Sequence, residues 1–323
     1  MYQIDNSTAA VSQPAATAAG SAGFFTDGNP ATSTPATIVP AEWLNAVMME
    51  LMNVVTASGA TANKAAYSQV LTAMKGMFSP VVGSARNLVM SVASASASAT
   101  LTADEIIVES ALGGQTYRLA SFSKTINLAT TGAGGMDTGT APVSGYVALY
   151  AIWNPTTQTA ALLAKAEGAS AAPSIYGGAN MPSGYTASAL VSVWPTNGSG
   201  QFVAGYQQDR AIDIVGATTL TTSTTQASPT ALSISAYVPK SAKYLNGTLS
   251  ASSTSNPQNT SVIVYSSGAG VGTQGVNNSV NASGGVSSPF RKLGMATSQT
   301  LYYSATSTAG TPTFTISVTG YEI

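Results

Sequence analysis

The side chains that could do acid–base or metal chemistry in this chain are few. Its 323 residues include 12 Asp and Glu and 11 Lys and Arg, with no histidine and no cysteine. Histidine is the commonest general base and metal ligand, and cysteine supplies thiolate nucleophiles, zinc ligands and disulfides. Their absence removes most enzyme mechanisms and leaves only carboxylate chemistry.

The carboxylates show no pattern typical of a glycosidase. Asp104 and Glu105 are adjacent, so a strand would point them to opposite faces of its sheet. Surface carboxylates in water are the ordinary case. We therefore predict that the protein is not an enzyme and has no catalytic residue, metal or cofactor. A glycan-cleaving site would require carboxylates to converge in the fold, and the candidates are Glu109, Asp137, Asp209 and Asp213.

Other ligand-binding signals are weak. Gly132–Asp137 resembles a phosphate-cradling loop, but no lysine follows it, and we interpret it as a β-turn. Basic residues are sparse and scattered, which predicts no nucleic-acid partner. No apolar run approaches the roughly 18–20 residues of a membrane helix, so no membrane insertion is expected. The absence of a signal-peptide pattern favours assembly in a cytoplasm.

The composition indicates a folded chain that associates with copies of itself. Only 7% of residues are charged and 44% are hydrophobic, with a net charge of −1, whereas disordered chains usually carry a high net charge. Small residues bury little apolar area each, so association would add stability. The length predicts two or three structural units.

The first regular elements that the sequence predicts are two helices near the N-terminus. Residues 1–36 lack periodicity and predict an extended arm, and residues 37–80 predict a helical hairpin. Its first helix should span about 40–58, ending before Gly59, and its second about 61–76. Apolar side chains recur on the first helix at intervals of three and four residues, which predicts a helix-packing and trimerisation contact formed by Trp43, Val47, Leu51 and Val54.

The remaining chain has the period of two that is typical of strands. Residues 81–215 predict a middle antiparallel β domain with hairpins at 146–164 and 189–206. Residues 216–323 predict a second, sandwich-like β domain, with a glycine bulge at Gly320. The fold class is therefore mainly β, with antiparallel β-sandwich or jelly-roll-like units and a small helical segment near the N-terminus.

The last domain carries the candidate contacts for a partner. Residues 216–323 hold four basic residues and one acidic residue, a balance of +3, against −2 in each of 1–80 and 81–215. Ser266–Ser288 is rich in Gly, Ser and Asn and predicts a long loop. Three tyrosines have the opposite parity to expected core residues and should face outward. The contact candidates are Tyr237, Tyr265, Tyr302, Arg291 and Lys292.

Several segments resemble tail fibre and receptor-binding proteins of tailed bacteriophages and prophages. The most specific is an unusual Gly/Pro loop joined to a Trp-bearing helix. The resemblance covers about the first two thirds of the chain, and the last third resembles fibre tips only in style. The segments are Gly23–Pro30, Pro35–Asn45, Ile126–Leu128, Gly134–Gly139, Tyr146–Pro155, Tyr176–Tyr185 and Gly205–Arg210.

The resemblance implies an elongated homotrimer of the virion tail. Its N-terminal part would dock on tail or baseplate proteins, and its distal β domain would bind a bacterial surface receptor, a glycan or a pilus. Two alternatives stay open: a tailspike-like polysaccharide depolymerase, and a structural connector between the baseplate and a separate adhesin. The short chain, the absence of a long β-helix repeat and the scarcity of carboxylates count against the depolymerase.

Overall fold

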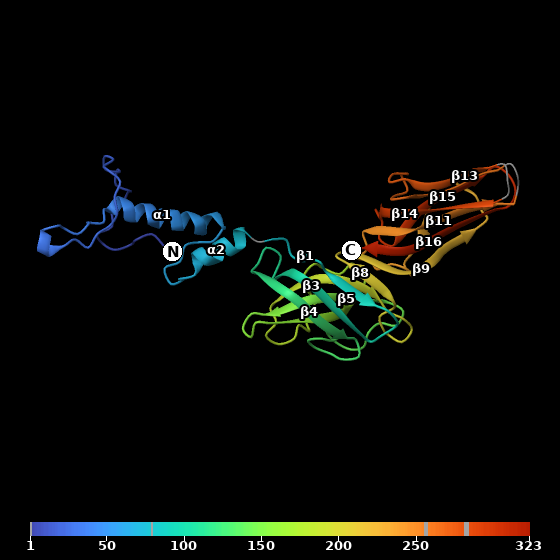
Figure 1. Cartoon of the computed structure of the whole chain (residues 1–323), viewed down its shortest axis with the longest axis horizontal. Coiled ribbons are helices and arrows are strands. Elements are labelled where there is room, and N and C mark those ends of the chain that lie inside the picture. Colours follow the sequence, from blue (N-terminus) through green and yellow to red (C-terminus); the bar gives the residue numbers. More distant parts are fainter. Residues whose placement is uncertain (1, 79, 255–257, 281–283) are drawn as a thin grey trace. The chain divides into compact units, whose positions relative to one another are not determined.

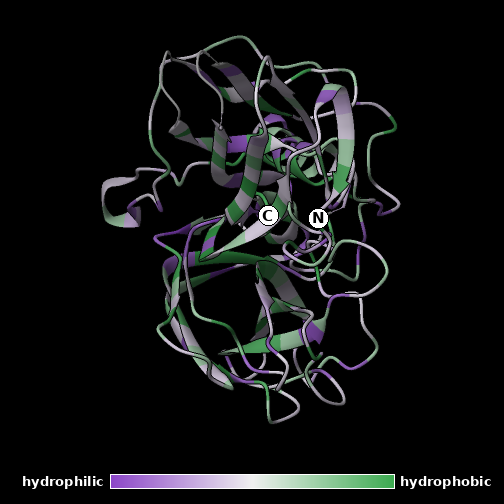
Figure 2. Cartoon of the chain, turned by 90° about the vertical axis from the view of Figure 1, so that its right-hand side faces the viewer, coloured by the Kyte–Doolittle hydropathy of each residue, from purple (hydrophilic) through white to green (hydrophobic). Residues whose placement is uncertain are grey.

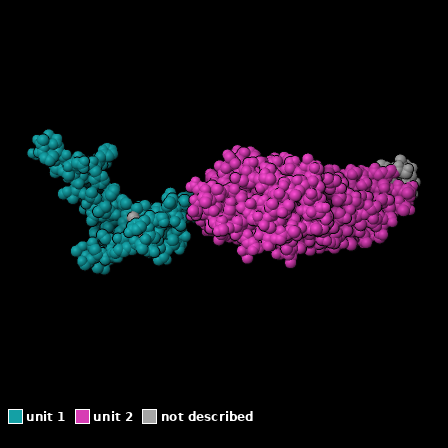
Figure 3. Space-filling model, turned by 90° about the horizontal axis from the view of Figure 1, so that it is seen from below, with its two compact units in different colours: residues 1–79 teal, residues 80–323 magenta. Residues whose placement is uncertain are grey.

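The computed structural model describes residues 2–78, 80–254, 258–280 and 284–323 (Figure 1). The chain divides into two compact units, unit 1 (Met1–Ser79) and unit 2 (Pro80–Ile323), which Figure 3 shows in different colours. Unit 1 holds two helices, and unit 2 holds the strands, whose ladders are antiparallel. The predicted mainly β fold with a small N-terminal helical segment is confirmed.

Unit 1 is built on helix α1 (Ala41–Ala57) and helix α2 (Gln69–Met77), which contact each other. The predicted first helix is confirmed, because Pro40 starts it and Gly59 follows its end with a φ of 78°. The predicted second helix begins eight residues too early. The Gln69 side chain accepts from the Asn63 backbone N–H (3.0 Å) and donates to the Thr61 carbonyl (2.9 Å), which holds this stretch in turns.

The N-terminal arm is extended and is tied to the helices of its own unit. The Glu42 carboxylate accepts from the backbone N–H (2.6 Å) and the hydroxyl (2.7 Å) of Thr17. Lys64 donates to the Asp5 carboxylate at 2.7 Å. The arm also contains the short 3-10 helix η1 (Pro30–Thr32), capped by the Asn29 side chain. The predicted extended arm is therefore held by contacts within one chain.

Unit 2 is dominated by a 12-stranded sheet. Its main path runs β14-β11-β16-β9-β8-β2-β3-β7-β5-β6, and β1 and β4 both pair with β3. The strands of this sheet are β1 (Ala85–Arg86), β2 (Val89–Val92), β3 (Ser98–Glu109), β4 (Thr116–Asn127), β5 (Tyr146–Asn154), β6 (Thr159–Ala166), β7 (Ala187–Pro195), β8 (Gly205–Gln208), β9 (Ala211–Thr222), β11 (Tyr244–Ser253), β14 (Gly284–Gly294) and β16 (Pro312–Glu322).

A second, four-stranded sheet covers one end of the large sheet. It consists of β10 (Gln226–Ser233), β15 (Thr300–Ser307), β12 (Gln258–Tyr265) and β13 (Gln274–Val280), in that order. β11 contacts both β12 and β13, and Figure 1 shows the two layers. Apolar side chains at alternating positions of the strands are buried here, among them Leu249, Val264 and Ile316. The predicted sandwich is therefore present in the C-terminal part of the chain.

The middle and C-terminal parts of unit 2 share one sheet. The domain boundary predicted at 215/216 falls inside β9, which pairs with β8 on one side and β16 on the other. In the middle part the large sheet curls so that β4 contacts β6. The core there is nearly continuous along β5 and β7, whose largest fully buried side chains are Tyr150 and Trp194. Figure 2 shows hydrophobic residues along the strands.

One predicted hairpin is confirmed and the other is wrong. β5 and β6 pair antiparallel from Val147↔Ala166 to Asn154↔Thr159. β7 does not pair with β8, because it lies between β3 and β5. The chain does return after β7, through the bridge Thr196↔Phe202 and a backbone hydrogen bond from Val203 N–H to the Pro195 carbonyl (3.2 Å), but β8 then pairs with β2 and β9.

The predicted bulge at Gly320 is confirmed. The register between β16 and β9 shifts between Val318 and Gly320. A Cβ at Gly320 would lie 2.7 Å from the Ile212 carbonyl oxygen, closer than side-chain carbons approach. Glycine is therefore required where the last strand bends.

Four tyrosines make the stability of unit 2 sensitive to alkali. Burial raises the pKa of Tyr146, Tyr150 and Tyr321, and burial with the hydrogen bond to Asp137 raises the pKa of Tyr176 to about 12. Unfolded tyrosines ionise near pH 10. The unfolded state therefore loses its protons first, and the free energy of unfolding should fall as the pH rises from about 10 to 12.

Denaturant titrations at a series of pH values would check this expectation. The Tyr176→Phe variant should show a shallower fall between pH about 10 and 12, because one of the shifted groups is gone. A free energy of unfolding that stays constant over this range would contradict the prediction.

Candidate binding surfaces

The carboxylates singled out in the sequence do not form one centre. The Asp137 side chain is almost fully buried, accepts from the Tyr176 hydroxyl (2.9 Å) and lies 3.5 Å from Lys165 Nζ. Glu109 accepts from the Gly113 backbone N–H at 3.2 Å. Within residues 2–78, 80–254, 258–280 and 284–323, no group of three or more acidic side chains could hold a metal ion.

The remaining carboxylates lie in separate places. Asp209 accepts from the Leu88 backbone N–H at 3.2 Å, and Asp213 lies beside the Gly320 bulge. Asp104 accepts from the Asn87 amide. The hydrogen bonds of Asp209 and Asp104 connect segments of neighbouring strands, which gives these two carboxylates a structural role.

The role of Glu167 was not predicted. Its carboxylate accepts from the Lys240 backbone N–H (2.9 Å), the Ser241 backbone N–H (2.9 Å) and the Ser241 hydroxyl (2.7 Å). These bonds join the end of β6 to the segment before β11. A sequence separation of 73 residues between Glu167 and Lys240 leaves no local signal for this contact.

The helix residues predicted to mediate packing are only partly covered in one chain. Trp43 is 46% exposed and Val47 is 39% exposed, whereas Leu51 and Val54 are half-buried. Val55, one position further along α1, is fully buried. Packing between copies through these helix residues stays a prediction. Such packing requires an exposed apolar surface, and Trp43 and Val47 provide one.

Further apolar residues of unit 1 that the sequence analysis did not single out are also exposed. The Phe25 ring lies edge-on to Trp43, with ring centroids 5.2 Å apart. We give the name apolar face of unit 1 to nine of the exposed large apolar side chains of this unit. It comprises Phe24, Phe25, Trp43, Leu44, Val47, Leu71, Met74, Met77 and Phe78.

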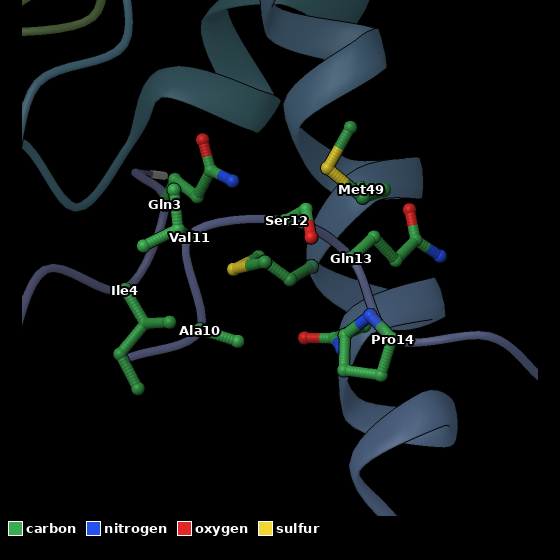
Figure 4. Close-up of a pocket in the computed structure, with 10 residues that line it drawn as sticks. Gln3, Ile4, Ala10, Val11, Ser12, Gln13, Pro14 and Met49 are labelled. Carbon is green, nitrogen blue, oxygen red and sulfur yellow. The ribbon is translucent and has the colours of Figure 1, made fainter. Parts of the chain in front are cut away.

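The N-terminal arm covers a different part of α1. A small cavity of about 70 Å³ lies between the arm and the helix. Figure 4 shows the arm from Ala10 to Pro14 passing across α1 beside Met49. The arm thus shields Met48 and Met49 and leaves Trp43 and Val47 exposed.

The tyrosines of the last third follow the expected parity. Val264 and Tyr303 are buried, while Tyr265 and Tyr302 are half-buried on the other face of the small sheet. These two tyrosines are cross-strand partners on β12 and β15. The Tyr265 hydroxyl lies 2.8 Å from Ser304 Oγ. The structure therefore brings two of the five candidates together.

The other three candidates lie apart from that pair. Tyr237 is half-buried in a turn after β10. Arg291 and Lys292 are exposed on β14, an edge strand of the large sheet, and Lys292 lies 3.3 Å from Glu322. Among the described residues, these side chains make no single pocket with the tyrosines.

The prediction of a long loop over Ser266–Ser288 is wrong for most of that segment. β13 occupies Gln274–Val280 and β14 begins at Gly284. Residues 281–283 lie outside the described part of the chain. Small polar residues form strands here because β13 pairs with β12 and β14 pairs with β11.

Comparisons with known proteins found a partial similarity. The chain is 42% identical over 77 residues to the "Uncharacterized protein StfP" of Escherichia coli (strain K12), a match covering 24% of this chain and 35% of that protein. No family model matches, and no solved structure is significantly similar. In the described part of the chain, no helix is long and apolar enough to cross a membrane.

Proposed function

We propose that this protein is a bacteriophage tail fibre subunit that attaches to the tail or baseplate through unit 1 and binds a host surface receptor through unit 2, without catalysis. The observation that carries the proposal is the apolar face of unit 1, which a single chain leaves exposed, in a chain whose other compact unit is built of strands. The sequence resemblance and the partial relative StfP support it.

The apolar face suits a homotrimer of the virion tail that also docks on baseplate proteins. An exposed Trp and Phe pair in contact is the kind of aromatic anchor that dominates protein interfaces. Three copies on one axis would also let weak receptor contacts act together.

The two alternative functions, depolymerase and connector, require different features of the protein. A depolymerase needs two carboxylates facing one glycosidic bond, whereas Asp137, Glu109 and Asp209 each accept a hydrogen bond from a different structural partner. A pure connector needs no receptor contact, so it would differ from an adhesin in whether the purified protein binds cells.

Competition for host cells tests the proposal. Purified protein added before the phage should reduce phage adsorption, and fluorescently labelled protein should bind the cells. Host mutants lacking lipopolysaccharide, capsule or pili would identify the receptor class. If the protein fails to bind every cell type to which the phage adsorbs, the connector is favoured. If the protein releases reducing sugar ends, the depolymerase is favoured.

If a fragment of the chain is used as the competitor, it should comprise residues 80–323 rather than 216–323. A cut at 216 would divide β9 and remove its pairing with β8. The substitutions Tyr265→Ala and Tyr302→Ala, separately from Arg291→Ala with Lys292→Ala, would test the two groups of receptor candidates in the whole chain.

A further inference from the structure

A cleft of about 290 Å³ lies in the middle part of unit 2, between β4 and the β5–β6 hairpin. Its volume is close to the lower end of the range for small-molecule sites, about 300 Å³. Three of its lining residues, Arg118, Lys124 and Gln158, carry long polar or charged side chains, and Trp153 adds an aromatic ring. Neither the acidic residues discussed above nor the five C-terminal candidates line it.

The cleft has a positive character. Arg118 and Lys124 both come from β4, and none of its lining residues is acidic. The nearest ion pair joins Arg118 Nε to Glu105 at 3.6 Å, with the two side chains 65% and 37% exposed. Such a long, exposed pair contributes little, so the guanidinium has donors left for a ligand.

An aromatic side chain forms another wall. Trp153 lines the cleft, and the Tyr117 ring lies 6.4 Å from it, tilted by 45°. The indole N–H is buried without an acceptor among the described residues. The ring offers an apolar surface, which suits the C–H face of a sugar.

Gln158 occupies a strained position at the mouth of the hairpin loop. Its φ is 54°, in the left-handed region that favours glycine. A glutamine here places an amide, with both donors and an acceptor, on the cleft wall. Ser121, another lining residue, also has a positive φ of 50°.

We propose that this cleft binds a saccharide carrying an anionic group, with the acid near Arg118 and Lys124, hydroxyls near Gln158 and a sugar ring against Trp153. Carboxylate and phosphate share the required chemistry. The inference rests on the proposed function and gives the receptor a chemical class. It also places one receptor contact in the middle part of unit 2, away from the C-terminal tyrosines.

Calorimetric titration of the full chain tests the ligand class. The probes are oligogalacturonate for carboxylate, a phosphorylated lipopolysaccharide core oligosaccharide for phosphate, and dextran as the neutral control. At least one acidic probe should bind, and its affinity should fall when NaCl is raised from about 20 to 500 mM. Failure of both acidic probes to bind, or equal binding of dextran, would overturn the inference.

Three variants locate the site. Arg118→Ala with Lys124→Ala should weaken binding by roughly tenfold or more, because charge-assisted hydrogen bonds are lost. Gln158→Gly should weaken binding while the melting temperature stays the same or rises, since glycine relieves the backbone strain. Lys75→Ala with Lys243→Ala is the matched control, because it removes equal charge from exposed positions that do not line the cleft, and it should leave probe binding unchanged.

Phage adsorption separates this inference from the proposed function. If the whole chain blocks adsorption and only the Arg291→Ala, Lys292→Ala protein loses that ability, the proposed function stands and the cleft is not the site. If the chain neither binds cells nor blocks adsorption, the proposed function fails as well. Cleft variants that alter subunit stoichiometry and leave probe binding intact would identify the cleft as a contact between copies.

Discussion

Replacing Trp43 and Val47 together by aspartate should convert the protein from an oligomer into monomers. Both side chains are exposed in a single chain, and Trp43 already contacts Phe25. Removing a large side chain from a packed contact costs about 3–5 kcal/mol, and burying two unpaired carboxylates adds a further penalty. Light scattering after size-exclusion chromatography at micromolar concentration would measure the change.

A control on the same helix separates contact from charge. Ala46 and Asn53 are exposed on the side of α1 that carries Glu50, so Ala46→Asp with Asn53→Asp adds the same charge beside the apolar face. This control should remain oligomeric. A monomeric wild-type protein, or a Trp43→Asp, Val47→Asp protein that still assembles, would show that this face is not the contact.

Replacing Tyr321 by alanine should destabilise the whole of unit 2 by about 3–5 kcal/mol. Tyr321 is fully buried on β16, and its hydroxyl donates to the Val193 carbonyl on β7 at 2.7 Å. Tyr321→Phe should cost less, about 1–3 kcal/mol, by leaving that carbonyl without its partner. Because β9 joins both parts of the sheet, the two parts should unfold together.

Tryptophan fluorescence during denaturation can test this coupling. The three tryptophans are Trp43, Trp153 and Trp194, so a Trp43→Phe background leaves signals only from the middle part of unit 2. Tyr321→Ala should shift their transition, whereas Tyr302→Ala, on the outer face of the small sheet, should shift it much less. An unchanged transition in Tyr321→Ala would mean that the C-terminal part unfolds independently.

Local patterns in the sequence were sufficient for several elements. The helix α1 from its apolar spacing and the glycine after it, the bulge at Gly320 and the β5–β6 hairpin were all predicted. Each depends on interactions between residues close in sequence or on the conformational limits of one residue. The second helix was misplaced because side-chain hydrogen bonds of Gln69 compete with helical ones.

Residue types and their alternation were enough to establish which side-chain chemistry this protein lacks and that its fold is mainly β. The pairing of the strands, the passage of β9 across the expected domain boundary and the meeting of Arg118, Lys124, Trp153 and Gln158 in one cleft became apparent only in the folded chain. Strand alternation specifies which face of a strand is buried, but it does not specify the partner strand. Pairing depends on side-chain packing and loop closure over long sequence separations, and these interactions exist only after folding.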